Sequence, residues 1–205
     1  MMKTIIFDID GTLFDTKSGI IHCLNDILDS YGCKKINERE EDKYIGPAIK
    51  DSLIKFNGFS DEIAMEATRK YRKKYVTKYV GESRPYKGLE DLLKYLKKNN
   101  YRICIATMKT KPQVEKLFEL FGISAFFEYI EVAKEKGGYT KINMLENIKA
   151  KYPYDKMLFV GDTIGDYTAS VKAEIPFVYA KYGYGRVLGI KCTTINSLLE
   201  LRLLL

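Results

Sequence analysis

Apolar residues along the chain follow two patterns, short continuous runs and helical stripes. The runs predict parallel-sheet strands at 5–7, 101–106, 129–132, 157–160 and 175–179. Apolar residues three and four positions apart predict helices at 17–31, 48–56, 61–80, 89–98, 112–121, 140–151 and 165–174, and a helix or apolar tail at 198–205.

The order of these elements predicts an α/β fold with an insertion. From residue 83 onward strands and helices alternate, which is typical of a Rossmann-like, doubly wound parallel sheet. Residues 15–82 contain only helical patterns. We therefore expect a sheet core formed by 1–14 and 83–205, with an all-helical module inserted at 15–82.

The first strand ends in two aspartates separated by one residue. Asp8 and Asp10 follow the apolar run and precede Gly11. Residues i and i+2 of an extended segment point to the same side, so both carboxylates can face one site. Buried like charges repel and are costly to desolvate, and a cation between them relieves both penalties. A chain-reversing turn at Asp10 and Gly11 explains the same residues equally well.

Polar residues also follow the later strands. Thr107 ends the second predicted strand, and Asp162 and Asp166 follow the fourth. Lys141 begins a helix, where its charge opposes the helix dipole unless an anion lies nearby. Ligands of doubly wound sheets bind beyond the carboxyl ends of the strands, so these groups are expected to converge. Carboxylates suit Mg²⁺, and a hydroxyl and an ammonium suit phosphate, which predicts metal-assisted phosphoryl transfer.

The composition is that of an ordinary globular protein. The 205 residues include 46% hydrophobic and 30% charged residues, enough for one core and a smaller second unit. No run approaches the roughly 20 apolar residues of a membrane span, and the N-terminus lacks the features of a signal peptide. Four scattered cysteines without a CxxC pair argue against a zinc site or a disulfide framework and favour the cytoplasm.

The net charge of +7 favours small anionic partners. Basic residues alternate with tyrosines at 69–75, which is one pattern of nucleic-acid binding. However, Tyr71, Tyr75 and Tyr79 are four positions apart and predict one packed helical stripe. We therefore expect no nucleic-acid partner. The single histidine, His22, lies on a predicted helix, and such a residue is more often a surface or partly buried group than a catalyst.

Taken together, the motifs resemble the haloacid dehalogenase superfamily. The resemblance covers nearly the whole chain and rests on Asp8-Ile9-Asp10-Gly11-Thr12, Thr107, Lys141 and Gly161-Asp162-Thr163-Ile164-Gly165-Asp166. The helical module resembles the cap of the phosphoglycolate phosphatase-like branch. Further features that look like this branch are Ile45-Gly46-Pro47 and Tyr182-Gly183-Tyr184-Gly185.

This resemblance implies an Mg²⁺-dependent phosphatase with an aspartyl-phosphate intermediate. Asp8 is the implied nucleophile, and Asp10 the implied acid and base that protonates the leaving alcohol and then activates water. Thr107 and Lys141 are implied to hold the transferring phosphoryl group. The implied metal ligands are Asp8, the Asp10 carbonyl, Asp162 and Asp166, the last either directly or through a neighbouring ligand.

Several assignments are specific to this sequence. Many relatives have Asn or Ser after the threonine, whereas Met108 offers no strong side-chain hydrogen bond here. Lys141 is preferred over Lys134 and Lys136 as the phosphate lysine because it begins a helix. Possible substrate contacts on the cap are Lys17, Gly46 and Lys50.

Asp10 separates some of the alternatives. A dehalogenase needs no acid at this position, because halide leaves without a proton. A phosphomutase similar to β-phosphoglucomutase uses the same two aspartates, and a pyrophosphatase fits the same scaffold, so both remain open. A basic, non-enzymatic binding module would be expected to lack Asp8 or Asp162. We expect a monomer or homodimer that acts on a small phosphorylated metabolite.

Overall fold

The computed structural model describes residues 3–134, 138–187 and 189–205. Its main sheet has the strand order β5-β4-β1-β6-β7-β8, and neighbouring strands run parallel. The strands are β1 Lys3–Phe7, β4 Tyr101–Thr107, β5 Tyr129–Val132, β6 Lys156–Gly161, β7 Phe177–Ala180 and β8 Thr193–Ile195. The expected doubly wound parallel sheet is thus confirmed, with β8 as an additional edge strand that the apolar runs do not predict.

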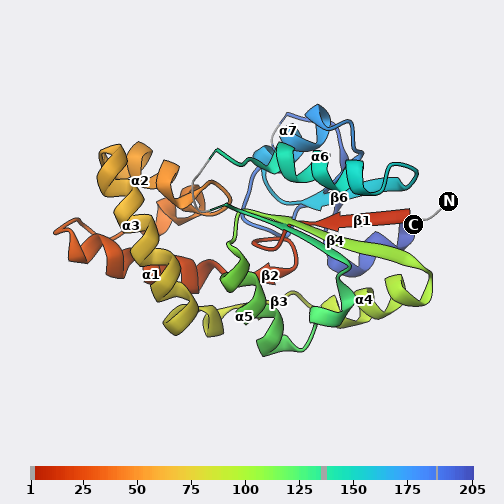
Figure 1. Ribbon diagram of the computed structural model, residues 1–205, viewed down its shortest axis with the longest axis horizontal. Coiled ribbons are helices and arrows are strands. Elements are labelled where there is room, and N and C mark those ends of the chain that lie inside the picture. The colour runs from red at the N-terminus through yellow and green to blue at the C-terminus, as the bar shows by residue number, and fades with distance from the viewer. Residues whose placement is uncertain (1–2, 135–137, 188) are drawn as a thin grey trace.

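Both faces of the central strand β1 are buried, as its apolar run predicts. Ile5 and Phe7 belong to one hydrophobic cluster, and Ile6 belongs to a second cluster on the opposite face. The helices α6 and α7 cover the face of Ile6, and α4, α5 and the short turn η5 cover the other (Figure 1). Their bounds are α4 Leu89–Lys98, α5 Lys111–Phe121, α6 Lys141–Lys151, α7 Ile164–Lys172 and η5 Leu198–Leu203.

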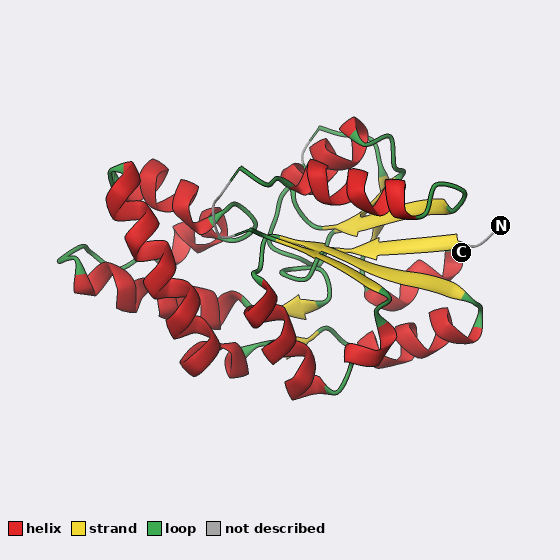
Figure 2. Cartoon of the chain, in the orientation of Figure 1, coloured by secondary structure: helices red, strands yellow, loops and turns green. Residues whose placement is uncertain are grey.

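A helical segment extends beyond one end of the sheet (Figure 2). Its elements are α1 Lys17–Ser30, η1 Glu38–Tyr44, α2 Ile49–Asn57, α3 Asp61–Lys74, η2 Tyr75–Tyr79 and η3 Val80–Glu82. The chain enters and leaves this segment through a ribbon of two antiparallel strands, β2 Phe14–Asp15 and β3 Arg84–Pro85. The expectation of a strand-free segment from residue 15 is therefore wrong at Asp15, because two-residue strands are too short to show a period of two. The division into core and cap at 14/15 and 82/83 stays a prediction.

The last helix of this segment changes its geometry at Tyr75. Ser60 caps α3 through a hydrogen bond from the Ile63 backbone N–H, 3.3 Å long. The expected continuous helix to residue 80 instead becomes a π-helical turn at Tyr75–Tyr79, a feature that is frequent at functional sites.

The tyrosine stripe packs as predicted, because Tyr71, Tyr75 and Tyr79 are all buried. These rings are unavailable for stacking on nucleic-acid bases. His22 is exposed and its ring nitrogen Nδ1 lies 2.7 Å from Glu82 Oε2, so it belongs to the surface. None of the helices in the described part of the chain combines the length and the apolar composition that crossing a bilayer requires.

Candidate active site

The two aspartates of the opening motif lie where β1 ends between β4 and β6. The Asp8 N–H donates to the Val160 carbonyl at 3.0 Å, which extends the pairing with β6 by one residue, and the Asp8 side chain is buried. The chain then reverses, with the Phe14 N–H bonded to the Ile9 carbonyl at 3.0 Å and Gly11 at a φ of +72°. The motif therefore forms a turn and also places Asp8 at the centre of the sheet edge, so the two interpretations of the sequence are compatible.

Lys141 forms two short ion pairs with carboxylates from two other elements. Its Nζ atom lies 2.9 Å from Asp8 Oδ1 and 2.8 Å from Asp166 Oδ1. Thr140 caps α6 by accepting the Asn143 N–H, so Lys141 is the first residue of the helix. Burial alone lowers the pKa of this ammonium, but the charges of Asp166 and Asp8 outweigh burial and raise the pKa.

Of the two competing lysines, Lys134 lies over the Tyr139 ring, with Nζ 3.8 Å from the ring centroid. Lys136 lies outside the described residues. Within the described chain, Lys141 is the lysine that reaches Asp8.

Asp166 has a second function in the local fold. Its N–H donates to Thr163 Oγ1 at 3.1 Å, and its Oδ2 accepts from the Thr163 N–H at 3.0 Å and hydroxyl at 2.7 Å. This reciprocal pattern is a capping box that begins α7. One carboxylate oxygen therefore fixes the helix, and the other faces Lys141.

Asp162 is held by the backbone of the 183–185 loop. Its Oδ2 accepts from the Tyr184 N–H at 2.8 Å and the Gly185 N–H at 3.2 Å. Its Oδ1 is buried and has no hydrogen-bond partner among the described residues. The close approach requires glycine at 183, because a Cβ there would lie 2.4 Å from the Asp162 Cβ.

Asp8, Asp162 and Asp166 form one buried carboxylate group, with one oxygen of each within 4.8 Å of the others. Burial raises the pKa of Asp8 to about 7 against the charge of Lys141, with Asp166 adding to the rise. Burial and the charges of Asp166 and Asp8 hold the pKa of Asp162 well above its usual range. Three carboxylates facing one ammonium leave an excess of negative charge, which a hard divalent cation neutralises. The unpartnered Asp162 oxygen and the all-oxygen donor set therefore fit Mg²⁺.

Thr107 is buried at the end of β4. Ile105 is the register partner of Phe7, so Thr107 lies at the same sheet edge as Asp8. Its Oγ1 accepts the Lys109 N–H at 3.3 Å.

Lys109 is a site residue that the sequence analysis misses. Its Nζ lies 2.8 Å from Asp10 Oδ1 and 3.3 Å from the Tyr75 hydroxyl, and only 4% of the side chain is exposed. Burial alone lowers its pKa, but Asp10 and Tyr75 outweigh burial and raise it. In the sequence, the one feature that indicates a role for Lys109 is its position two residues after Thr107, where β4 ends.

The three expected cap contacts lie near the core to different degrees. Gly46 approaches Thr163, since a Cβ at 46 would lie 2.9 Å from Thr163 Cγ2. The Lys50 ammonium is paired with Asp61 at 2.5 Å, within the helical segment. The Lys17 ammonium lies 2.7 Å from Asp42 Oδ1.

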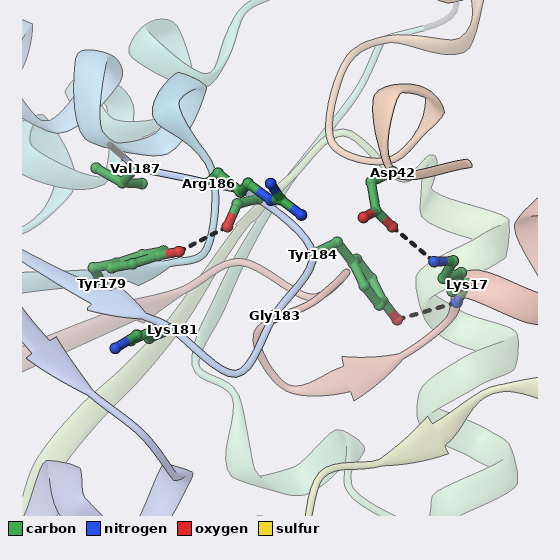
Figure 3. A pocket seen from close by; sticks show the side chains of 9 residues that line it. Lys17, Asp42, Tyr179, Lys181, Gly183, Tyr184, Arg186 and Val187 are labelled. Atoms are coloured by element: carbon green, nitrogen blue, oxygen red, sulfur yellow. Dashed lines mark hydrogen bonds and ion pairs between the residues drawn. The ribbon is translucent and has the colours of Figure 1, made fainter. Parts of the chain in front are cut away.

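Lys17 also borders a cavity of about 500 Å³ between the helical segment and the 179–187 stretch (Figure 3). In Figure 3 the Tyr184 hydroxyl points toward Lys17, and the Arg186 side chain extends away from Tyr179 toward the middle of the view. The cavity neighbours the loop that holds Asp162, but its lining does not include the three carboxylates. Its lining residues are Lys17, Asp42, Tyr179, Lys181, Gly183, Tyr184, Gly185, Arg186 and Val187.

Comparison with known proteins identifies the family. Residues 5–180 match the family described as haloacid dehalogenase-like hydrolase. The chain belongs to this family. The match covers most of the main sheet and the whole helical segment. This haloacid dehalogenase-like protein is therefore a hydrolase, as the resemblance of its motifs implies.

Two relatives illustrate the range of names in this family. The chain is 27% identical to the phosphoglycolate phosphatase of Aquifex aeolicus over 187 residues, which is 89% of this chain and 86% of that protein. It is 29% identical to the tyrosine-protein kinase PtkA of Mycobacterium tuberculosis over 90% of this chain, but this spans only 64% of PtkA.

The fold also resembles that of a solved structure described as a predicted phosphatase from Clostridium acetobutylicum. The TM-score is 0.90 at 25% identity, and the superposition covers 100% of this chain and 99% of the other. The whole architecture, helical segment included, is thus shared with a protein described as a phosphatase.

Proposed function

We propose that this haloacid dehalogenase-like protein is an Mg²⁺-dependent phosphatase that hydrolyses a small phosphate monoester through an aspartyl-phosphate on Asp8. The buried group of Asp8, Asp162 and Asp166 around the Lys141 ammonium is the observation that carries the proposal. The site combines a nucleophilic oxygen, a cation site and a phosphate-binding cation within a few ångströms.

In the first step an Asp8 carboxylate oxygen attacks phosphorus in line with the ester oxygen. The new O–P bond forms as the P–O bond to the leaving group breaks, and the electron pair stays on the leaving oxygen. Asp10 donates a proton to that oxygen, so an alcohol departs. Asp10 then accepts a proton from water, whose oxygen attacks the phosphorus and releases Asp8 and inorganic phosphate.

Mg²⁺ would be held by Asp8, the Asp10 main-chain carbonyl, Asp162 and Asp166. When bound, the cation neutralises charge on the phosphoryl oxygens and on the carboxylates. Asp162 is preorganised for this task because two backbone N–H groups fix its other oxygen. Asp166 is fixed in the same way by its capping box, so its Oδ1 is the oxygen directed at the site.

Lys141 and Thr107 are assigned to the transferring phosphoryl group. The Lys141 ammonium lies beside the nucleophile, where it can neutralise charge on a bound phosphate. Thr107 offers a buried hydroxyl at the same strand edge. Met108, which is half-buried, supplies no polar side chain, so substrate orientation there falls to backbone groups.

The helical segment is assigned as a cap that excludes water and selects the leaving group. Gly46 packs against Thr163, the neighbour of Asp162. Lys17 contributes a cation to the cavity between the helical segment and the 179–187 stretch. Because Lys17 and Lys50 already have acidic partners, an anionic leaving group would have to compete with Asp42 and Asp61 for them.

The test is phosphate release with and without Mg²⁺ from 4-nitrophenyl phosphate, phosphoglycolate, a nucleoside monophosphate, a sugar phosphate and pyrophosphate. We expect Mg²⁺-dependent turnover that is abolished in Asp8→Asn and unchanged in Asp29→Asn, a matched change at an exposed aspartate. Asp10→Asn should slow turnover while still binding Mg²⁺, since the main chain is the ligand. Retained turnover in Asp8→Asn would exclude the covalent mechanism.

The same experiment separates a phosphatase from each of the alternatives. A phosphomutase interconverts sugar phosphates without releasing phosphate, and a pyrophosphatase prefers pyrophosphate over every ester. A kinase activity such as the name PtkA denotes transfers phosphate from ATP to tyrosine. A binding module releases no phosphate from any member of the panel.

A further inference from the structure

Lys109 carries a buried ammonium that joins the proposed acid and base, Asp10, to the helical segment. Its Nζ lies 2.8 Å from Asp10 Oδ1 and 3.3 Å from the Tyr75 hydroxyl, and it is 4.6 Å from the centre of the Tyr75 ring. Tyr75 is fully buried at the start of the π-helical turn. Asp10, Tyr75 and Lys109, which are far apart in the sequence, therefore meet at the Lys109 ammonium.

The backbone around Lys109 is fixed on both sides. Its N–H donates to Thr107 Oγ1 at 3.3 Å, and its carbonyl accepts the Ala133 N–H at 2.9 Å. Thr110, the next residue, caps α5 in a capping box. The ammonium is thus supported by a strand end and a helix start, which is the rigid support that precise placement of a side chain needs.

The two oxygens of Asp10 have different surroundings. Oδ1 lies against the Lys109 ammonium and accepts the Thr16 hydroxyl. Across the residues that the structure describes, neither a hydrogen bond nor an ion pair involves Oδ2. The carboxyl is therefore anchored through one oxygen, and the other is available for proton transfer.

We propose that Lys109 is a positioning residue that anchors Asp10 through Oδ1 and so presents Oδ2 to the leaving-group oxygen. This inference rests on the proposed phosphatase function. In the transfer step the proton on Oδ2 moves to the leaving oxygen as the P–O bond breaks. The Asp10 carboxylate that this step forms is negatively charged and lies beside the Lys109 ammonium. Tyr75 belongs to the helical segment, and its hydroxyl meets Lys109, so it extends the support to the proposed cap.

The test compares two aryl phosphates that differ in their need for an acid. 4-Nitrophenyl phosphate has a good leaving group that departs without a proton, whereas phenyl phosphate has a poor one. The value of kcat/KM reports the steps up to release of the phenol, so it isolates the proton donation by Asp10. The variants are Lys109→Met and Lys109→Arg, with Lys116→Met as the control at a partly exposed lysine of α5 whose ammonium pairs with Glu119.

In Lys109→Met we expect kcat/KM to fall about 100-fold for phenyl phosphate, the effect of a misplaced catalytic group, and only a few-fold for 4-nitrophenyl phosphate. Lys109→Arg should restore part of the phenyl phosphate activity because it keeps the charge. Adding Asp10→Asn to Lys109→Met should cost little more, since both changes remove one function.

An equal fall for the two substrates, or no fall, would overturn the proposal. If Lys109→Met does not fold, as the absence of a cooperative melting transition would show, Lys109→Gln takes its place with the same criterion. Failure of the proposed function looks different, because wild type and Lys116→Met would then hydrolyse neither substrate. In that case both the proposed phosphatase function and the assignment of Lys109 are wrong.

Discussion

The Lys141 ammonium lies 2.9 Å from Asp8 Oδ1, at the first residue of a helix. A lysine at this position opposes the helix dipole, so its placement is unfavourable for the isolated helix. The neighbouring carboxylates offset that cost. The arrangement therefore links the stability of the site to its charge balance, and this link can be measured.

Replacing Lys141 with Met removes the ammonium from a group of three buried carboxylates. We expect a loss of about 100-fold or more in kcat/KM, because the cation beside the transferring phosphoryl group is gone. The metal-free protein should also melt at a lower temperature, since unpaired buried charge is costly. Lys141→Arg should retain more activity and stability than Lys141→Met. Lys172→Met, at an exposed lysine of α7, is the control. An equal loss of kcat/KM in this variant would contradict the assignment of Lys141 to the phosphoryl group.

The raised pKa of Asp8 predicts how the stability of the metal-free protein depends on pH. The folded protein binds this proton up to about pH 7, whereas the unfolded chain releases it near its ordinary value of 3.8. Between these values the folded state binds more protons, so the free energy of unfolding falls as the pH rises. Asp162 acts in the same direction. Thermal melting in a chelator should therefore give a lower melting temperature at about pH 8 than at about pH 5.5.

Mg²⁺ should reverse this trend, because it binds the ionised carboxylates of the folded protein only. The gain in melting temperature on adding Mg²⁺ should be larger at about pH 8 than at about pH 5.5. Sodium chloride at equal ionic strength is the control, since it screens charge without occupying the site. A gain that is independent of pH would contradict the assignment of the ligands.

Ligands of doubly wound sheets bind beyond the carboxyl ends of the strands, and this explains which parts of the site could be predicted from the sequence. Asp8, Thr107 and Asp162 each follow a buried apolar run, and parallel strands bring their carboxyl ends to one edge. Lys141 could be found because a lysine at a helix start is unusual. Each of these signals is local, within a few residues of the functional side chain.

Lys109 shows what local signals miss. It follows β4 in a lysine-rich chain, and its partners Asp10 and Tyr75 lie 99 and 34 residues away. Whether a lysine is solvated or buried against an acid depends on the packing of the helical segment over the sheet. The same limit applies to β2, β3 and β8, whose two or three residues are placed by tertiary pairing and not by a periodic pattern.

Gly183 offers a test of how tightly the backbone holds Asp162. A Cβ at this position would lie 2.3 Å from the Gly11 carbonyl oxygen and 2.4 Å from the Asp162 Cβ. Gly183→Ala must therefore displace the loop or the carboxylate, at a cost of about 1–3 kcal/mol in unfolding free energy. We expect weaker Mg²⁺ binding and lower kcat. Gly81→Ala, where a Cβ meets no atom within 4 Å, should change neither.

Tyr184 connects the Asp162 loop to the start of the helical segment. Its N–H donates to Asp162, while its hydroxyl oxygen accepts the Thr16 and Lys17 N–H groups at 2.6 and 3.1 Å and donates to Asp15. The phenol thus serves as the N-terminal cap of α1, whose own Thr16 side chain makes no cap hydrogen bond.

Tyr184→Phe leaves the buried Thr16 N–H without a partner, whereas the Lys17 N–H keeps its bond to Asp15 Oδ1 at 3.2 Å. The change should lower the unfolding free energy by about 1–2 kcal/mol. Because β2 and α1 form the entry to the helical segment, which we propose to be the cap, KM should rise more than kcat falls. The Asp162 hydrogen bond comes from the backbone, so Mg²⁺ affinity should change little. Tyr154→Phe, at an exposed tyrosine, is the matched control. A selective loss of Mg²⁺ affinity in Tyr184→Phe would instead mean that the ring holds the metal loop in place and that the cap entry is supported by other contacts.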